Sequence, residues 1–75
     1  MKALILGAAG FVGPYLIKEF ADHGYEVFAS DIVPDFKHEK AKYFQADITN
    51  FESIKNLLAK TKPDYLVNLA AISSV

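Results

Sequence analysis

The sequence predicts a single α/β domain built on a central parallel sheet, and two features of the chain point to that fold. Short apolar segments that suit buried strands alternate with segments that suit helices. A turn with glycine at every third position, Gly7-Ala8-Ala9-Gly10-Phe11-Val12-Gly13, joins the first strand to the first helix. At 75 residues, the chain is expected to form one domain over residues 1–75.

The first strand and the first helix are predicted around the glycine turn. Residues 3–6 are a continuous apolar run, as expected for a strand buried on both faces. Residues 11–23 are predicted to be helical, with Pro14 in the first turn, where a missing N–H costs little, and Gly24 as the stop. The apolar face of this helix is expected to contain four side chains, Phe11, Tyr15, Leu16 and Phe20.

Two further strands are predicted next in the sequence. Residues 26–30 form the second strand, which ends at Asp31. Residues 32–41 contain Pro34 and several charged residues, which is typical of a solvated connection, and residues 43–46 are predicted to form a short third strand.

The second helix and a fourth strand complete the pattern. Thr49 and Glu52 have the spacing of a capping box, which places the start of a helix here. Pro63 helps to end this helix, and residues 65–69 are again apolar and predict a strand. The expected core-facing stripe of the helix is Phe51, Ile54, Leu57 and Leu58.

The handedness of the connections fixes the order of these strands. Right-handed crossovers place the second strand beside the first and the third beyond it, and the second helix then carries the fourth strand to the other side of the first. The predicted order is 3-2-1-4, which is the first half of a doubly wound, Rossmann-like sheet.

The glycine turn predicts a site for a dinucleotide pyrophosphate. Gly7, Gly10 and Gly13 allow backbone amides to approach a phosphate closely, because no Cβ intervenes. The following helix directs its unpaired N–H groups and positive dipole end at the same place. The alternative is a strand–helix turn without a ligand. A Walker-type loop is excluded, because no Gly-Lys-Ser/Thr follows.

Asp31 favours NAD over NADP as the cofactor. A carboxylate at the end of the second strand can accept hydrogen bonds from the adenosine ribose hydroxyls, and it repels a 2′-phosphate. The chain contains no arginine, the usual residue for binding that phosphate, and apolar Ile32 and Val33 follow the acid. The alternative for Asp31 is a solvated acid in a turn.

Other candidate residues follow the third and fourth strands. Asp47 precedes Ile48 at the end of the third strand, although Asp47 is equally explained as the start of a turn. Residues 68–71 end the fourth strand at the sheet edge where ligands bind, and their small side chains let a cofactor lie against backbone. Ser73 and Ser74 are either hydrogen-bonding groups there or polar loop residues, and no histidine partner supports a hydrolase triad.

Composition narrows the partners and the location. A net charge of −1 gives no reason to expect nucleic acid or an anionic membrane as a partner. Two isolated histidines and no cysteine predict no metal site. The apolar start resembles a signal peptide, but three glycines and Pro14 interrupt it, and no apolar run approaches the ~20 residues of a membrane span. We therefore expect a cytoplasmic location.

Four motifs in order resemble the N-terminal part of extended short-chain dehydrogenase/reductases. They are the glycine turn at residues 7–13, Asp31, Asp47-Ile48, and the segment Pro63-Asp64-Tyr65-Leu66-Val67-Asn68-Leu69-Ala70-Ala71. The last segment, continued to Val75, is similar to the nucleotide-sugar branch. That branch contains UDP-glucose 4-epimerases, GDP-mannose 4,6-dehydratases and GDP-6-deoxy-hexulose reductases.

The resemblance implies a role for each matching residue. Gly7, Gly10, Phe11, Val12 and Gly13 would surround the pyrophosphate, Asp31 would bind the adenosine ribose, and Asp47 and Ile48 would meet the adenine. Leu69, Ala70 and Ala71 would line the cofactor near its ribose and phosphates. Leu6 departs from the family, which usually has threonine there. The family's catalytic Tyr-x-x-x-Lys is absent, because none of the four tyrosines has lysine four residues later.

Two hypotheses for the function follow. In the first, the chain binds the ADP portion of NAD within a nucleotide-sugar epimerase, dehydratase or reductase, is not catalytic alone, and meets a nucleotide-sugar only as part of a longer enzyme. In the second, it is a non-catalytic module that forms homo-oligomers through an exposed fourth strand or an uncovered sheet face. A flavodoxin-like or receiver-like domain fits the alternation of elements but not the glycine spacing.

Overall fold

A computed structural model describes residues 1–70 and contains the predicted alternation of strands and helices. The elements are, in order, β1 (Lys2–Leu6), α1 (Gly13–Asp22), β2 (Glu26–Asp31), β3 (Ala41–Gln45), α2 (Phe51–Thr61) and β4 (Tyr65–Asn68). The third strand begins two residues earlier than predicted, because it pairs with β2 from Val27 onward.

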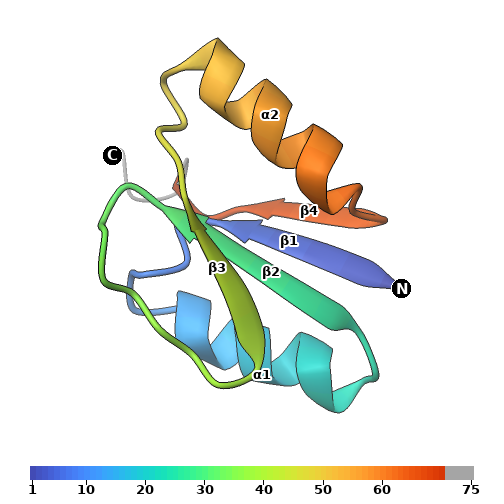
Figure 1. The fold of residues 1–75 in the computed structure, drawn as a ribbon. Helices are drawn as coiled ribbons and strands as arrows, with labels where there is room; N and C mark the ends of the chain where they lie inside the picture. The colour runs from blue at the N-terminus through green and yellow to red at the C-terminus, as the bar shows by residue number, and fades with distance from the viewer. Residues whose placement is uncertain (71–75) are drawn as a thin grey trace.

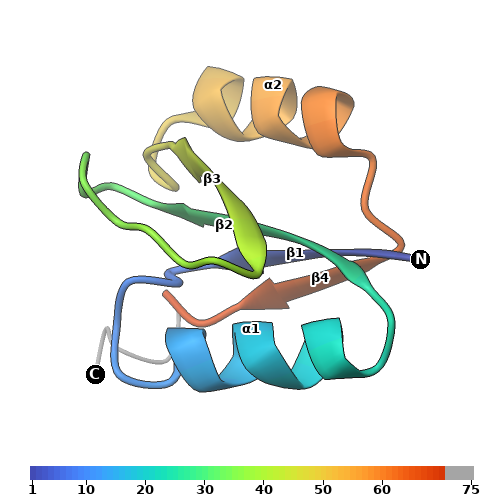
Figure 2. The same cartoon turned by 60° about the horizontal axis from the view of Figure 1, so that its bottom comes forward.

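The sheet confirms the predicted topology. The four parallel strands lie in the order β3-β2-β1-β4, with β1 and β2 in the middle (Figure 1). Helix α1 covers one face of the sheet and α2 covers the other (Figure 2). Because all four strands are parallel, their carboxyl ends meet at one edge of the sheet, where the turn after β1 also lies.

The core has two layers, one on each face of the sheet. Successive side chains of a strand point to opposite faces. Ile5 therefore packs with Ile17 of α1, whereas Leu4 and Leu6 pack with Leu57 of α2. The central strands are almost fully buried, which explains why β1 lacks polar residues after Lys2.

The predicted apolar face of α1 was partly wrong. Phe11 lies in the turn before the helix and is 96% exposed, and Tyr15 is also exposed. Because the helix begins at Gly13, the residues one and two turns later face the sheet, and Ile17 is the fully buried anchor. Leu16 and Phe20, which were predicted, do pack against this cluster.

The predicted start of α2 was displaced by one residue. Asn50 caps the helix, and its side-chain oxygen accepts a hydrogen bond from the Ser53 amide at 3.1 Å. Thr49 instead lies one residue before the cap, and its amide and hydroxyl both donate to Asp47. Phe51, predicted to face the core, is 78% exposed at the first helical position.

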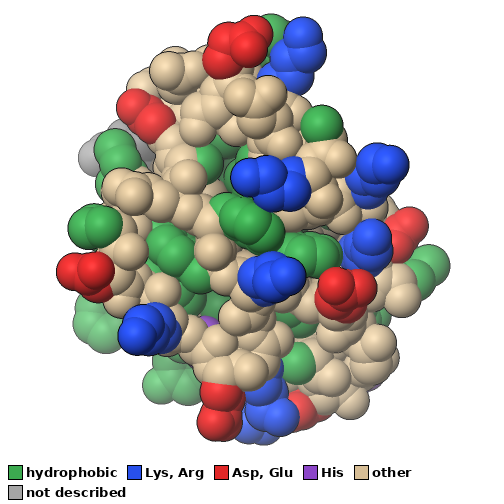
Figure 3. Space-filling view, in the orientation of Figure 1, with side chains coloured by type: hydrophobic (Ala, Val, Ile, Leu, Met, Phe, Trp, Pro, Cys, Tyr) green, Lys and Arg blue, Asp and Glu red, His purple; other side chains and the backbone are tan. Residues whose placement is uncertain are grey.

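No helix among residues 1–70 is long and apolar enough to cross a membrane. On the face shown in Figure 3, lysine and acidic side chains alternate over the surface and do not gather into one basic patch.

Close backbone contact places α1 against the end of β1. A Cβ built on Gly13 would lie 1.8 Å from the Ala8 carbonyl oxygen, so no larger residue fits without a backbone shift. A Cβ on Gly10 would meet nothing nearer than the Gly7 carbonyl oxygen at 3.7 Å, which is ordinary contact. The two glycines therefore have different structural roles.

This difference predicts opposite outcomes for two otherwise identical substitutions. Gly13→Ala should lower the free energy of unfolding by about 3 kcal/mol, because the overlap is with backbone and cannot be relieved by a rotamer change. Gly10→Ala should change it by less than about 1 kcal/mol. Urea denaturation followed by circular dichroism measures both. Equal stability of the two variants would contradict this account of the turn.

Candidate functional site

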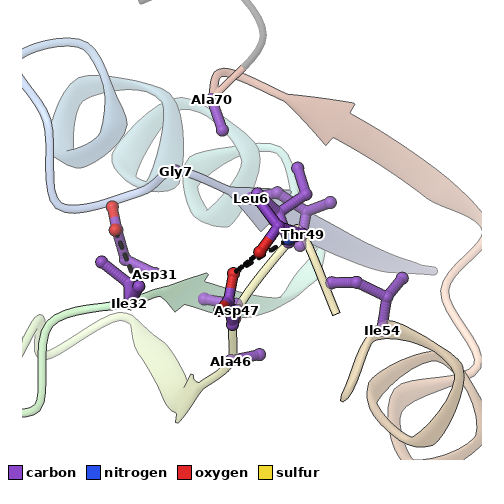
Figure 4. Close-up of a pocket in the computed structure, with 11 residues that line it drawn as sticks. Leu6, Gly7, Asp31, Ile32, Ala46, Asp47, Thr49, Ile54 and Ala70 are labelled. Atoms are coloured by element: carbon purple, nitrogen blue, oxygen red, sulfur yellow. Dashed lines mark hydrogen bonds between the residues drawn. The ribbon is translucent and has the colours of Figure 1, made fainter. Parts of the chain in front are cut away.

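Two adjoining cavities open at the carboxyl ends of the strands. The larger, of about 350 Å³, lies over the glycine turn and has seven lining residues, all among the predicted site residues: Gly7, Gly10, Phe11, Val12, Asp31, Leu69 and Ala70. The smaller, of about 220 Å³, lies on the α2 side of the sheet between the ends of β2 and β3 and helix α2 (Figure 4). Gly7, Asp31 and Ala70 line both, so the two cavities adjoin at these three residues.

The glycine turn is fastened to the neighbouring strand by its own amides. The amides of Gly7 and Ala8 both donate to the carbonyl oxygen of the buried Ser30, at 2.9 and 3.1 Å. Gly7 has a φ of +75°, and a Cβ there would lie 2.6 Å from the Ala70 amide nitrogen. Glycine at this position is therefore required by the approach of the chain that follows β4, whether or not a ligand is present.

The N-terminus of α1 faces the larger cavity, and no side chain among residues 1–70 caps it. Its N-cap residue, Val12, provides no side-chain cap, and the first turn contains no acidic residue. Within the described part of the chain, the N–H groups of Phe11, Val12 and Gly13 donate no hydrogen bond. Unpaired N–H groups and the positive end of the helix dipole make this place suited to an anion.

Gly10 lies in this cavity, and the protein's own packing does not explain it. Its φ is not positive, and a Cβ there would make only an ordinary contact, with the Gly7 carbonyl oxygen at 3.7 Å. The chain therefore keeps a gap at Gly10 beside unpaired amides. Such a gap fits a phosphate group that must approach the backbone closely.

Asp31 connects the glycine turn to the end of β2. One carboxylate oxygen, Oδ2, accepts a hydrogen bond from the Ala9 amide at 2.9 Å, and the other, Oδ1, accepts one from the Ile32 amide at 2.7 Å. A carboxylate has about four lone-pair sites, so two remain for a ligand. The predicted alternative of a freely solvated acid is wrong, because the side chain is partly buried and bonded to the turn.

Sequence reasoning missed two residues of β3 that hold the segment after Asp31. The Tyr43 hydroxyl lies within hydrogen-bond distance of the carbonyl oxygens of Asp31, at 2.9 Å, and of Val33. Gln45 Nε2 donates to the Ile32 carbonyl at 2.8 Å. Burial first, and the nearby Asp31 carboxylate second, raise the pKa of the Tyr43 hydroxyl, which keeps it a donor. Tyr43 and Gln45 are two residues apart, which places both side chains on one face of a strand. This spacing was the one signal in the sequence that could have pointed to them.

Asp47 forms a tight turn at the edge of the smaller cavity (Figure 4). Its Oδ1 accepts hydrogen bonds from the Thr49 hydroxyl at 2.6 Å and the Thr49 amide at 2.9 Å. The hydroxyl bond first, and the amide bond second, lower the pKa of the Asp47 carboxyl. Ile48 also lines this cavity and is exposed.

One predicted site residue, Gly13, does not join the others, and another, Ala71, is not among the described residues. Gly13 is buried against Ala8 and lines neither of the two cavities. Ala71 lies outside the described residues, as do Ser73 and Ser74. Leu69 is held by its amide, which donates to the Leu6 carbonyl oxygen at 2.9 Å.

Comparison with known proteins identifies the family. The model of the NAD dependent epimerase/dehydratase family matches residues 3–75. The chain belongs to this family. Its description as NAD dependent agrees with the cofactor that the sequence predicts, and the membership confirms the resemblance drawn from the four motifs.

Individual relatives are similar over the whole of this chain but are much longer. GDP-6-deoxy-D-talose 4-dehydrogenase of Aggregatibacter actinomycetemcomitans is 36% identical over 78 aligned residues, covering 100% of this chain and 22% of the relative. UDP-glucose 4-epimerase of Lactobacillus helveticus is 30% identical, covering 100% and 24%. The structure of UDP-glucose 4-epimerase with UDP-glucose from Thermotoga maritima has a TM-score of 0.83 and 27% identity, covering 99% and 25%. The chain thus spans about a quarter of the length of these relatives.

The Asp47 turn predicts a specific titration. Thr49→Val removes the hydroxyl bond, so the pKa of the Asp47 carboxyl should rise toward its ordinary value, whereas Thr49→Ser should leave it low. Because the folded-state pKa is lowered, the stabilisation is present above the unfolded-state pKa of about 3.9 and is lost as the pH falls through the folded-state value. Carboxyl ¹³C chemical shifts followed from pH 2 to 7 measure this. An unchanged titration in Thr49→Val would show that the hydroxyl bond has no effect.

Proposed function

We propose that this chain binds the ADP portion of NAD, as the N-terminal cofactor-binding part of a nucleotide-sugar epimerase, dehydratase or reductase. The observation that carries the proposal is the gap at Gly10, which faces the uncapped start of α1 in a chain that belongs to an NAD dependent family. The nucleotide-sugar class follows from relatives named as a GDP-6-deoxy-D-talose dehydrogenase and as UDP-glucose epimerases.

The pyrophosphate is proposed to lie over the glycine turn. The N–H groups of Phe11 and Val12 would donate to its oxygens, and the positive end of α1 would favour its charge. The exposed Phe11 side chain, beside the larger cavity, would be covered by the bound molecule. Gly7 would act indirectly, by allowing the turn to form.

The adenosine is proposed to occupy the smaller cavity. Asp31 lies where both cavities meet, so its remaining lone pairs can accept hydrogen bonds from the ribose hydroxyls. Beyond it, Ile32, Ala46 and Ile48 give the cavity apolar walls suited to a flat base. Asp47 would act at the rim, with its carboxylate already engaged by Thr49.

The chain's own residues bind and orient the ADP portion and contain no catalytic pair of the Tyr-x-x-x-Lys type. The chemistry that NAD supplies when bound is hydride transfer. The proposed division of labour is therefore that residues 7–13 and 31 hold one end of the cofactor, while proton transfer to the substrate requires groups that this sequence does not contain.

A calorimetric titration tests the cofactor proposal. NAD and ADP-ribose should bind with similar affinity, because the contacts are with the ADP portion, and NADP should bind more weakly. Gly10→Ala should weaken NAD by about tenfold or more, since its methyl group occupies the gap beside the phosphate. Ala59→Val, which adds bulk at an exposed position of α2, is the matched control and should bind normally. Absence of saturable binding by NAD and ADP-ribose would overturn the proposal.

We also propose a second function, self-association through the outer edge of β4 at Tyr65 and Leu66. Within the described sheet β4 pairs only with β1, and its Tyr65 and Leu66 are 49% and 51% exposed. An unpaired apolar strand edge is a template for pairing with another chain, here a second copy. Cofactor binding and self-association are compatible, because the two sites use different surfaces.

Sedimentation equilibrium tests the second function. The chain should form a dimer or larger oligomer at micromolar concentration, and Leu66→Lys should shift it to monomer, because a charge on a strand edge opposes pairing. Phe51→Lys alters another exposed apolar residue, on α2, and should leave the oligomer intact. A wild-type chain that remains monomeric would exclude the β4 interface.

A further inference from the structure

Three consecutive carbonyl groups, at the end of β2 and just beyond it, face two side chains of the neighbouring strand. The Tyr43 hydroxyl, which has one proton, lies within hydrogen-bond distance of the carbonyl oxygens of Asp31 and Val33, and the Ile32 carbonyl accepts from Gln45 Nε2. We call these contacts, made by Tyr43 and Gln45, the β3 clamp. The carbonyls of Ile32 and Val33 are therefore directed toward β3, although these two residues lie past the end of their strand.

Neighbouring contacts hold the two side chains of the β3 clamp in position. Asp31 and Gln45 are the last partners of the β2–β3 pairing, and the Ala46 amide adds a hydrogen bond to the Asp31 carbonyl at 2.9 Å. The Tyr43 ring packs on the Phe36 ring with centroids 5.3 Å apart, which fixes the direction of its hydroxyl. Gln45 is largely exposed, so its bond to the Ile32 carbonyl is not forced by burial.

The orientation of residues 31–33 determines what the cavity offers to a ligand. With the carbonyls turned to β3, the Ile32 amide donates to Asp31 Oδ1 and its side chain lines the smaller cavity (Figure 4). The cavity wall beside the ribose position therefore consists of a carboxylate and an apolar side chain. A 2′-phosphate there would meet negative charge and no free N–H from residue 32.

We propose that Tyr43 and Gln45 are positioning residues that set the preference for a dinucleotide without a 2′-phosphate. They act through the 31–33 segment, by keeping its amide on the Asp31 carboxylate and its carbonyls away from the cavity. This inference rests on the proposed binding of NAD. The role of Tyr43 and Gln45 differs from that of Asp31, because removing the clamp leaves the Asp31 carboxylate and its charge in place.

Loss of the clamp should relax this preference in a defined direction. Once Gln45 is removed, the peptide group of the Ile32 carbonyl can rotate, and its N–H, which belongs to Val33, becomes a donor for a phosphate when it turns toward the cavity. The Val33 carbonyl precedes Pro34, which has no N–H, so Tyr43 acts only by holding the segment against β3. The ratio of the dissociation constants for NADP and NAD should then fall. One or two lost hydrogen bonds correspond to about a threefold to tenfold change in that ratio.

The test measures NAD and NADP affinities by calorimetry for wild type, Tyr43→Phe and Gln45→Met. Tyr43→Phe keeps the ring that packs on Phe36, and Gln45→Met removes the donor at an exposed position where the fold is least affected. Tyr25→Phe removes a tyrosine hydroxyl just before β2, at the end of the sheet opposite the cavities, and is the matched control. The Ile32 amide resonance in ¹H–¹⁵N spectra reports directly on the segment.

The expected result is a lower ratio with a shifted Ile32 amide, larger in Gln45→Met than in Tyr43→Phe, and an unchanged ratio in Tyr25→Phe. An unchanged ratio in folded clamp variants that still bind NAD would overturn this inference and leave the proposed function intact. Equal weakening of NAD and NADP would also overturn it, since that is a structural loss without selectivity. Absence of NAD binding by wild type would instead remove the proposed function and the inference with it.

Discussion

The structure depends above all on close contact between backbones at the end of β1. Gly7 lets the chain after β4 approach within the distance that a Cβ would occupy, and Gly13 lets α1 start directly against Ala8. The Gly7 and Ala8 amides meanwhile share the buried Ser30 carbonyl. These contacts fix where α1 points, and so they place its unpaired N–H groups over the cavity. The fold and the proposed phosphate site thus have one common cause.

Asp31 combines a structural role with the binding role that we propose for it. Its carboxylate joins the turn after β1 to the segment after β2, and it lines both cavities. A charged group that is partly held by two amides is well oriented before any ligand arrives, which reduces the ordering needed on binding. The β3 clamp adds to this arrangement, because it orients the peptide groups of residues 31–33, including the one whose amide donates to the carboxylate.

Regular patterns in the sequence were enough to predict the strand order, both helices and the glycine turn, because each leaves a local signal in polarity or in glycine spacing. Local signals misplaced the cap of α2 at Thr49, whose hydroxyl donates to Asp47. They also assigned Phe11 to the first helix, although it precedes that helix. Tyr43 and Gln45 were missed because their partners lie on another strand, and only the β2–β3 register brings them together. The cofactor roles of the individual site residues remain predictions.

The central claim is that the turn after β1 and the ends of β2 and β3 form one binding site for the ADP portion of NAD. The most direct measurement is a ¹H–¹⁵N spectrum of this chain titrated with ADP-ribose, which maps contacts residue by residue. The account predicts saturable shifts concentrated in the amides of residues 7–13, 31–32 and 46–49, with α2 beyond its first turn unaffected. Shifts that are absent, or that gather on the surface around β4, would contradict it.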